Sequence, residues 1–231
     1  MAETVRKERD TIGSIEIPNH ALWGAQTQRS LINFAIGQDL IPINLIHALA
    51  KIKKAAAVVN NKLGVLDNAK KDLIVKAASQ IEEGFHDSQF PLNVWQTGSG
   101  TQTNMNINEV ISNIGSQITG TPLGSHKPLH PNDDVNRSQS TNDVFPASIQ
   151  IAVIKGIRRE LLPEINLLIK AFDIKSNEWN KIIKVGRTHL QDAVPLTLGQ
   201  EASAWRDQIA SAHNRIENCL HELYPLPLGG T

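Results

Sequence analysis

Three segments of this sequence combine hydroxyl and amide side chains with flexible residues, a composition suited to holding a small carboxylate. The first is residues 97–104, Thr-Gly-Ser-Gly-Thr-Gln-Thr-Asn. Glycine lets backbone N–H groups approach a ligand closely, and the helix expected to follow offers unpaired N–H donors at its start. The segment therefore predicts a carboxylate cradle, although a polar turn that caps a helix would have the same composition.

The second segment, residues 138–143, opens a long helical pattern with Ser-Gln-Ser-Thr-Asn-Asp. Capping a helix needs only one or two such side chains, so the excess of donors favours a binding role. A separate polar turn just before it contains His130, four residues after His126. Pro128 and Pro131 argue against a helix that presents both imidazoles to a metal ion, and no metal site is expected.

The third segment, residues 186–192, lies between two long helical patterns and has the sequence Gly-Arg-Thr-His-Leu-Gln-Asp. His189 could act there as a general acid or base, because an unperturbed imidazole titrates near neutral pH. A surface or capping histidine is the alternative interpretation, and the segment alone does not decide between the two. All three segments lie at expected helix ends, and this repetition favours a functional interpretation.

Apolar residues recur at steps of three and four through much of the chain, which predicts amphipathic helices. One such stripe runs from Leu45 to Leu63, and Asp67 is the expected N-cap of the next helix. A third helix is expected directly after the first polar segment. Strand-like alternation is scarce, so the sequence predicts a mainly α fold.

A loop and a domain boundary are expected at residues 119–137, which are rich in Gly, Pro, Asn and Asp and lack periodicity. The sequence therefore predicts an N-terminal, mainly helical domain at 1–137. Residues 138–231 are expected to form the first part of a central helical bundle, truncated in this chain.

Two long helices are expected within that second part. The first covers residues 143–180 and should be kinked at Pro163, because proline removes a backbone hydrogen bond. The second begins with a capping box at Thr197 and carries a heptad-like apolar stripe over residues 198–223. Two such helices leave much apolar surface uncovered, so the chain needs partner chains, further sequence, or both.

The composition indicates a globular protein without overall charge. Lys plus Arg and Asp plus Glu each number 23, which argues against a general binder of nucleic acids or anionic membranes. The single cysteine, Cys219, excludes an internal disulfide, fits a reducing compartment and is expected to be buried. The start lacks a secretory signal, and no apolar run approaches the roughly 20 residues that span a bilayer. We therefore expect a soluble, cytoplasmic protein.

The three segments, taken in order, resemble signature regions of the class II fumarate hydratases, or fumarases. The similar stretches are residues 98–110, 130–146 and 186–201, and Arg9-Asp10 and residues 23–30 are similar to the same family. The resemblance covers the whole chain, which looks like the N-terminal half of the usual chain. It implies the fumarase/aspartase-like fold, with an N-terminal helical domain followed by the first long helices of a central bundle.

The resemblance implies reversible hydration of fumarate to malate, without a cofactor. His189 would be the catalytic acid/base residue. The substrate would be bound by Ser99, Gly100, Thr101, Ser140, Thr141, Asn142 and Thr188. A secondary dicarboxylate site is implied at Lys127, His130, Pro131, Asn132 and Asp133. Position 127 is often arginine in relatives, and lysine keeps the charge but loses the bidentate fork.

Other parts of the family's site have no counterpart in these 231 residues. The base usually assigned is a serine on a mobile Gly-Ser-Ser-x-Met-Pro-x-Lys-x-Asn loop, whose Lys and Asn hold a carboxylate. A glutamate that pairs with the histidine is also absent. Relatives are homotetramers in which three subunits build each active site. The resemblance therefore implies a dicarboxylate and other copies of the chain as partners, and little activity from this portion alone.

Two other functions stay open. Aspartate ammonia-lyases share the fold, but they usually carry Gln where this chain has His189, and they lack the Gly-Ser-Gly-Thr-Gln form of residues 98–102. Both differences favour water over ammonia as the group added. A non-catalytic helical assembly is the second alternative, although such a protein would have little reason to carry all three polar segments.

Overall fold

The computed structural model describes residues 4–229, which form two compact units. One unit contains the described residues up to Ala152 together with those from Leu226 onward, and the other is Val153–Pro225. The domain boundary expected near residue 137 stays a prediction. The division into two units is based only on contacts within one chain, and it does not test that boundary. None of the helices in the described part is long and apolar enough to cross a membrane.

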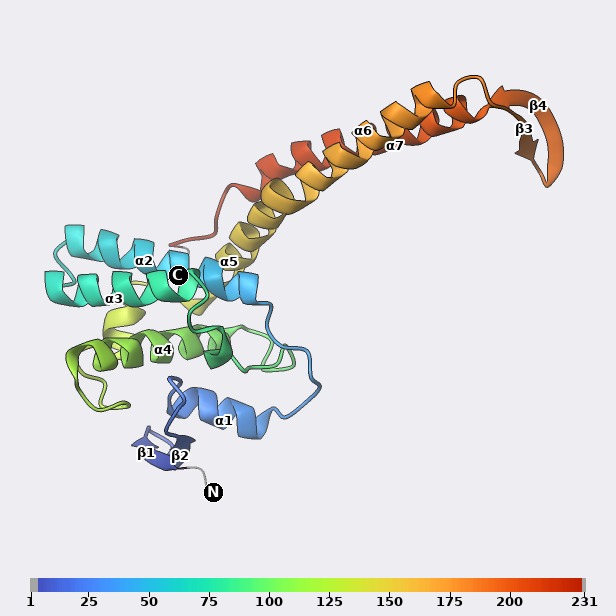
Figure 1. Cartoon of the computed structure of the whole chain (residues 1–231). Helices are drawn as coiled ribbons and strands as arrows, with labels where there is room; N and C mark the ends of the chain where they lie inside the picture. The colour runs from blue at the N-terminus through green and yellow to red at the C-terminus, as the bar shows by residue number, and fades with distance from the viewer. Residues whose placement is uncertain (1–3, 230–231) are drawn as a thin grey trace. The chain divides into compact units, whose positions relative to one another are not determined.

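The first unit begins with an antiparallel hairpin and continues with helices (Figure 1). In the hairpin, Val5 pairs with Pro18 and Arg9 pairs with Ser14. The elements in chain order are β1 (Val5–Arg9), β2 (Ser14–Pro18), α1 (Ala25–Asn33), α2 (Ile43–Lys62), α3 (Asn68–Glu82), the 3₁₀ turn η1 (Asp87–Gln89), α4 (Thr101–Thr119), the π-helical turn η2 (Pro131–Val135) and α5 (Thr141–Gly156).

The core of this unit lies where α2, α3 and α4 pack together. Fully buried side chains such as Leu49, Ile74 and Ile107 come from all three helices. The stripe predicted for α2 is wrong toward its end, because Val59 and Leu63 are 52% and 70% exposed. The buried face of α2 is instead continued by Lys53, Ala57 and Asn60, so this helix buries two polar side chains among its apolar contacts.

Two predicted helix caps are confirmed. Asp67 accepts a hydrogen bond from the Lys70 backbone N–H at 2.8 Å at the start of α3. Thr197 precedes α7 (Leu198–Leu223), where its hydroxyl accepts from Gln200 N–H and the Gln200 amide oxygen accepts from Thr197 N–H. Both caps satisfy backbone N–H groups that the first turn of a helix leaves unpaired.

The second unit consists of helices joined by a hairpin (Figure 1). The π-helical turn η3 (Ile157–Leu161) leads into α6 (Leu162–Glu178), and α7 runs back along α6. Pro163 lies in the first turn of α6 and cannot donate a backbone hydrogen bond. A π-helical turn directly precedes α6, and the kink expected at Pro163 stays a prediction.

Residues 186–192, which were expected to connect two long helices, instead form the end of a hairpin, β3 (Ile183–Thr188) with β4 (Gln191–Thr197). A register shift between Val185 and Arg187 interrupts the alternation that would have predicted the strands. The unit leaves much apolar surface uncovered, since Leu167, Ile174 and Trp205 are all exposed. The expected burial of Cys219 is wrong, because this residue of α7 is exposed among the described residues.

Candidate active site

The first polar segment forms a tight turn that leads into α4. Gly98 and Gly100 have φ angles of 79° and 77°, a left-handed conformation that glycine adopts without strain. The hydroxyls in the turn contact one another, with Ser99 Oγ lying 3.3 Å from Thr97 Oγ1 and 3.0 Å from Thr101 Oγ1. The turn therefore presents a cluster of exposed hydroxyls at the N-terminus of a helix, where the helix dipole favours a negative charge.

The second polar segment meets the first in space. Asn104 Nδ2, in the first turn of α4, donates to Thr141 Oγ1 at 3.1 Å in the first turn of α5. A Cβ atom at Gly100 would come within 2.4 Å of the Phe145 ring, so the absence of a side chain there allows α5 to approach the turn. Two of the three predicted segments thus form one surface.

The start of α5 keeps polar side chains free for a ligand. The Ser140 backbone N–H donates to Asp143 Oδ1 at 3.1 Å, and the Ser140 carbonyl accepts from Val144 N–H at 3.0 Å. Within residues 4–229, neither the Ser140 hydroxyl nor the Asn142 side-chain amide has a hydrogen-bond partner. Because the cap is formed without them, these two groups can both donate to an anion at the helix N-terminus.

Behind this surface lies a buried polar network that the sequence interpretation missed. Lys53 Nζ donates to Asn136 Oδ1 at 2.8 Å, and the same oxygen accepts from Asn104 Nδ2 at 3.1 Å. Burial of the Lys53 ammonium lowers its pKa to about 7, and the nearby Asp143 carboxylate opposes that shift. The sequence spacing could have indicated that Lys53 is buried, because it lies four residues from both Leu49 and Ala57 on the buried face of α2.

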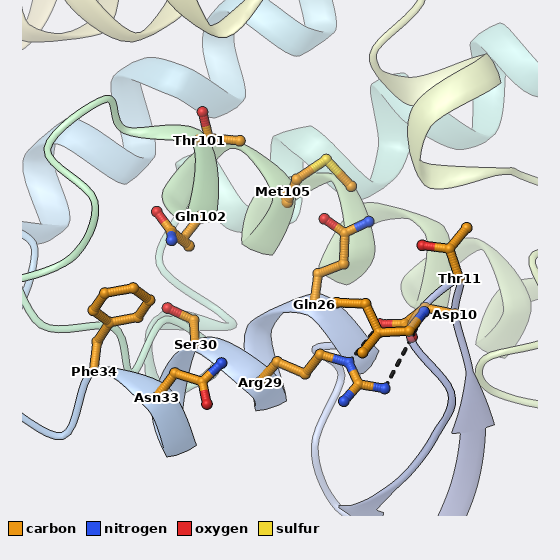
Figure 2. Close-up of a pocket in the computed structure, with 11 residues that line it drawn as sticks. Asp10, Thr11, Gln26, Arg29, Ser30, Asn33, Phe34, Thr101, Gln102 and Met105 are labelled. Atoms are coloured by element: carbon orange, nitrogen blue, oxygen red, sulfur yellow. Dashed lines mark hydrogen bonds and ion pairs between the residues drawn. The ribbon is translucent and has the colours of Figure 1, made fainter.

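Two cavities border Thr101, and they share several other residues. The first, of about 330 Å³, lies between α1 and the start of α4 (Figure 2). In its wall Arg29 donates to both oxygens of Asp10, at 2.7 and 2.9 Å. This paired guanidinium lowers the pKa of Asp10 to about 2 and leaves this wall without a net charge.

The second cavity, of about 470 Å³, is lined by His130, Pro131 and Asn132 of the predicted secondary site, together with Arg9. His130 Nδ1 accepts from the backbone N–H groups of Asn132 and Asp133, at 3.3 and 3.1 Å, so its ring is fixed on the turn η2. Lys127 and Asp133, the other two predicted residues, do not line this cavity.

Two further groups shape the wall of the second cavity. Burial, and secondarily the neighbouring His130 ring at 4.9 Å, lower the pKa of His126. Glu109 accepts hydrogen bonds from the backbone N–H groups of Gly24, Gln26 and Thr27 and from the Thr27 hydroxyl. Burial raises the pKa of Glu109, and these hydrogen bonds act in the opposite direction. The carboxyl fixes the start of α1, and with it the shared wall of the two cavities.

Thr188 and His189, the remaining predicted residues, belong to the second unit and lie at the tip of the β3–β4 hairpin. Both are exposed. His189 and Leu190 have φ angles of 51° and 63°, the conformation of a type I′ turn that Asn and Gly normally occupy. Leu190 is 98% exposed. The structure therefore brings together the predicted residues of the first two segments, whereas the third segment belongs to a separate compact unit.

Comparisons with known proteins agree on one family for this chain. The lyase family matches residues 13–231. A class II fumarate hydratase of Prochlorococcus marinus (strain MIT 9313) is 68% identical over 231 residues, which is the whole chain and 50% of that protein. A class II fumarate hydratase of Yersinia pestis is 51% identical over 228 residues, 99% of the chain and 49% of that protein.

Solved structures agree with the mainly α fold. The class II fumarase of Schistosoma mansoni superposes with a TM-score of 0.95 at 43% identity, covering 99% of the chain and 48% of that structure. A fumarate lyase:delta crystallin of Brucella melitensis gives 0.94 at 41% identity, covering 98% and 53%. The chain thus spans about half the length of the relatives it matches. A family match of this extent shows that the chain belongs to the lyase family, and within it the chain is similar to the class II fumarate hydratases.

Proposed function

We propose that the complete product of the gene encoding this chain catalyses the reversible hydration of fumarate to malate. One observation carries the proposal: two hydroxyl-rich helix starts meet, linked by the 3.1 Å hydrogen bond between Asn104 and Thr141. Similarity to class II fumarate hydratases supports water as the group added. The lone, unpaired Cys219 is compatible with a cytoplasmic location, which is part of the same proposal.

The chemistry requires stabilisation of a carboxylate that gains charge. Removing a proton from C3 of malate leaves its electrons on the neighbouring carboxylate, as a dianionic aci form. Donors that tighten on this group in the transition state are worth roughly 10²–10³-fold each. Ser140, Thr141 and Asn142 would supply such donors from α5, and Ser99, Gly100 and Thr101 would bind from the facing turn.

His189 would act as the acid/base residue beside the C2 hydroxyl, with Thr188 binding the same substrate. The base that removes the C3 proton would come from a segment outside these 231 residues, so we expect little or no activity from this chain alone. Rapid conversion of fumarate by purified residues 1–231 would contradict that expectation. A His189→Asn variant of the complete protein with near-normal turnover would contradict the role of the imidazole.

We further propose that the site is shared between subunits of a homotetramer. The exposed apolar faces of α6 and α7 support association with other copies, since a monomer rarely exposes apolar surface of this extent. The hairpin tip supports the same view. Left-handed backbone at a non-glycine residue costs about 1–3 kcal/mol, and docking of the exposed Leu190 onto another subunit would offset that cost.

The second cavity is the proposed secondary dicarboxylate site. His130, Pro131 and Asn132 line it together with Arg9, which would supply a positive charge for an anion, although the carboxyl residues Asp10 and Glu109 line it too. Asp133 lies within the turn η2 that carries Pro131 and Asn132, and Lys127 precedes this turn, so both would act from the adjoining surface.

The activity is tested directly by the loss of ultraviolet absorbance as the conjugated diacid is hydrated. Malate and aspartate are compared as substrates for the reverse reaction, and a preference for aspartate would favour an ammonia-lyase. Absence of both activities in the complete gene product would favour a non-catalytic assembly.

Sharing between subunits is tested by mixing two variants with impaired activity, Thr141→Val and His189→Asn. If the two residues come from different subunits, co-expression creates some sites with both residues intact and restores part of the activity. Thr141→Val mixed with Ser140→Ala is the matched control, because both changes fall on the same segment and no mixed site is complete. Equal recovery in the two mixtures, or none in either, would refute the shared site.

A further inference from the structure

Lys53 is a charged residue in the core of the first unit. Its side chain is fully buried on α2, and its ammonium donates to Asn136 Oδ1 at 2.8 Å. Within the described residues this is its one hydrogen bond, although an ammonium carries three donors. Replacing a buried charge with an apolar side chain of similar volume is often neutral or stabilising, so packing alone gives no reason for a lysine here.

A series of hydrogen bonds connects Lys53 to the candidate site, and the donor of each bond is fixed. Lys53 Nζ donates to the Asn136 amide oxygen, and it keeps N–H donors whether or not it carries the extra proton. The amide nitrogen of Asn136 then donates to the Gln139 carbonyl at 3.2 Å. The same Asn136 oxygen accepts from Asn104 Nδ2 at 3.1 Å, and this fixes which end of the Asn104 amide faces Thr141.

The consequence falls on the Thr141 hydroxyl. Asn104 Nδ2 donates to Thr141 Oγ1 at 3.1 Å, so the threonine oxygen is an acceptor on its buried side and its own proton points elsewhere. Asn104 Oδ1 is buried without any partner in this arrangement. If the amide turned over, that oxygen could accept the Thr141 proton. An unpartnered buried oxygen costs about 1–3 kcal/mol, which indicates that the network, and not Asn104 itself, imposes the orientation.

We propose that Lys53 is a positioning residue that, through Asn136 and Asn104, keeps the Thr141 hydroxyl as a donor toward the substrate carboxylate. This inference rests on the proposed function, because it assigns Thr141 to substrate binding. Without the Lys53 donor, the two amides lose the constraint on their direction, and the Thr141 proton can be captured by Asn104.

The test is a double-mutant cycle on the complete gene product, with hydration of fumarate as the readout. Lys53→Met and Thr141→Val are each expected to lower kcat/KM by about ten- to a hundredfold. The double variant is expected to lose no more kcat/KM than the less active of the two single variants, because residues in one network act as a unit. Lys62→Met is the matched control, an exposed lysine on the same helix, and should retain wild-type kcat/KM.

A purely structural role of Lys53 would lower stability and activity together, so thermal unfolding is measured on the same samples. We expect Lys53→Met to melt at or above the wild-type temperature while kcat/KM falls. Should it fail to fold, Asn136→Leu replaces it in the cycle, since this change breaks the link to Asn104 and leaves Lys53 in place. The same non-additive loss with Thr141→Val is expected.

The outcomes separate the two claims. An inactive wild-type protein would overturn the proposed function and this inference with it. An active wild type in which the losses of the Lys53 (or Asn136) and Thr141 variants multiply would overturn this inference alone. So would unchanged kcat/KM in a folded Lys53→Met variant.

Discussion

Replacing Lys53 with methionine should stabilise the folded chain at neutral pH and remove part of its pH dependence. The ammonium is fully buried, and burial lowers its pKa from 10.5 to about 7. Methionine keeps a similar length and removes the desolvation penalty of the charge. The opposing loss is the 2.8 Å hydrogen bond to Asn136, worth about 1.5–3 kcal/mol while its donor is charged. The variant is therefore expected to exceed the wild type in unfolding free energy at pH 7 by roughly 1–4 kcal/mol.

The sign of the pH effect follows from which state binds the proton. Above pH 7 the folded chain has lost the Lys53 proton, whereas the unfolded chain keeps it until about pH 10.5. The unfolded state therefore binds more protons, and stability rises with pH across this window. Between pH 7 and pH 9 the wild type should gain about 2 kcal/mol from this group, and Lys53→Met should gain none of it.

Urea unfolding of both proteins at pH 7, 8 and 9 measures this difference, because the other titrating groups are common to both and cancel. The advantage of Lys53→Met over the wild type should shrink steadily as pH rises. Lys62→Met, on the exposed surface of the same helix, should run parallel to the wild type. A constant difference between Lys53→Met and the wild type from pH 7 to pH 9 would refute the lowered pKa of Lys53.

Three further predictions concern the surroundings of the site. Ser140→Ala should lower kcat/KM for fumarate in the complete protein by about ten- to a hundredfold without lowering the melting temperature, because its hydroxyl has no partner among the described residues. Gly100→Ala should destabilise the chain by about 1–3 kcal/mol in urea unfolding, since the added methyl group meets the Phe145 ring at a φ of 77°. Arg29→Met should weaken the pH dependence of stability below pH 4. The folded pKa of Asp10 is lowered to about 2, so this group stabilises the wild type above its ordinary pKa and loses that contribution as pH falls from 4 to 2.

Local interactions were predictable from the sequence. The caps at Asp67 and Thr197 each join a side chain to a backbone group three residues later, so their pattern is complete within four residues. The turn at residues 97–101 was recognisable for a similar reason, because only glycine takes a left-handed conformation freely at two nearby positions.

The hairpin that carries His189 was not predictable in the same way. Its strands are short, a register shift breaks their alternation, and its tip has His189-Leu190 where a type I′ turn favours Asn-Gly. The network behind Thr141 was missed for another reason. It joins residues from α2, α4 and the turn before α5, and only tertiary packing brings these together.

The distribution of chemistry between the two units bears on how such a site could work. The first unit holds the free donors of Ser140 and Asn142 at a helix N-terminus, a surface that can bind and polarise a carboxylate. The second unit holds His189 on an exposed hairpin tip, with left-handed backbone and an apolar neighbour, Leu190, that is 98% exposed. A surface that stabilises charge on a carboxylate but transfers no proton can only bind the ligand. An imidazole without such a surface is a base with no means of selecting a substrate. The carboxylate-binding donors and the imidazole therefore belong to different compact units, and this separation is the physical ground for proposing a site shared between copies.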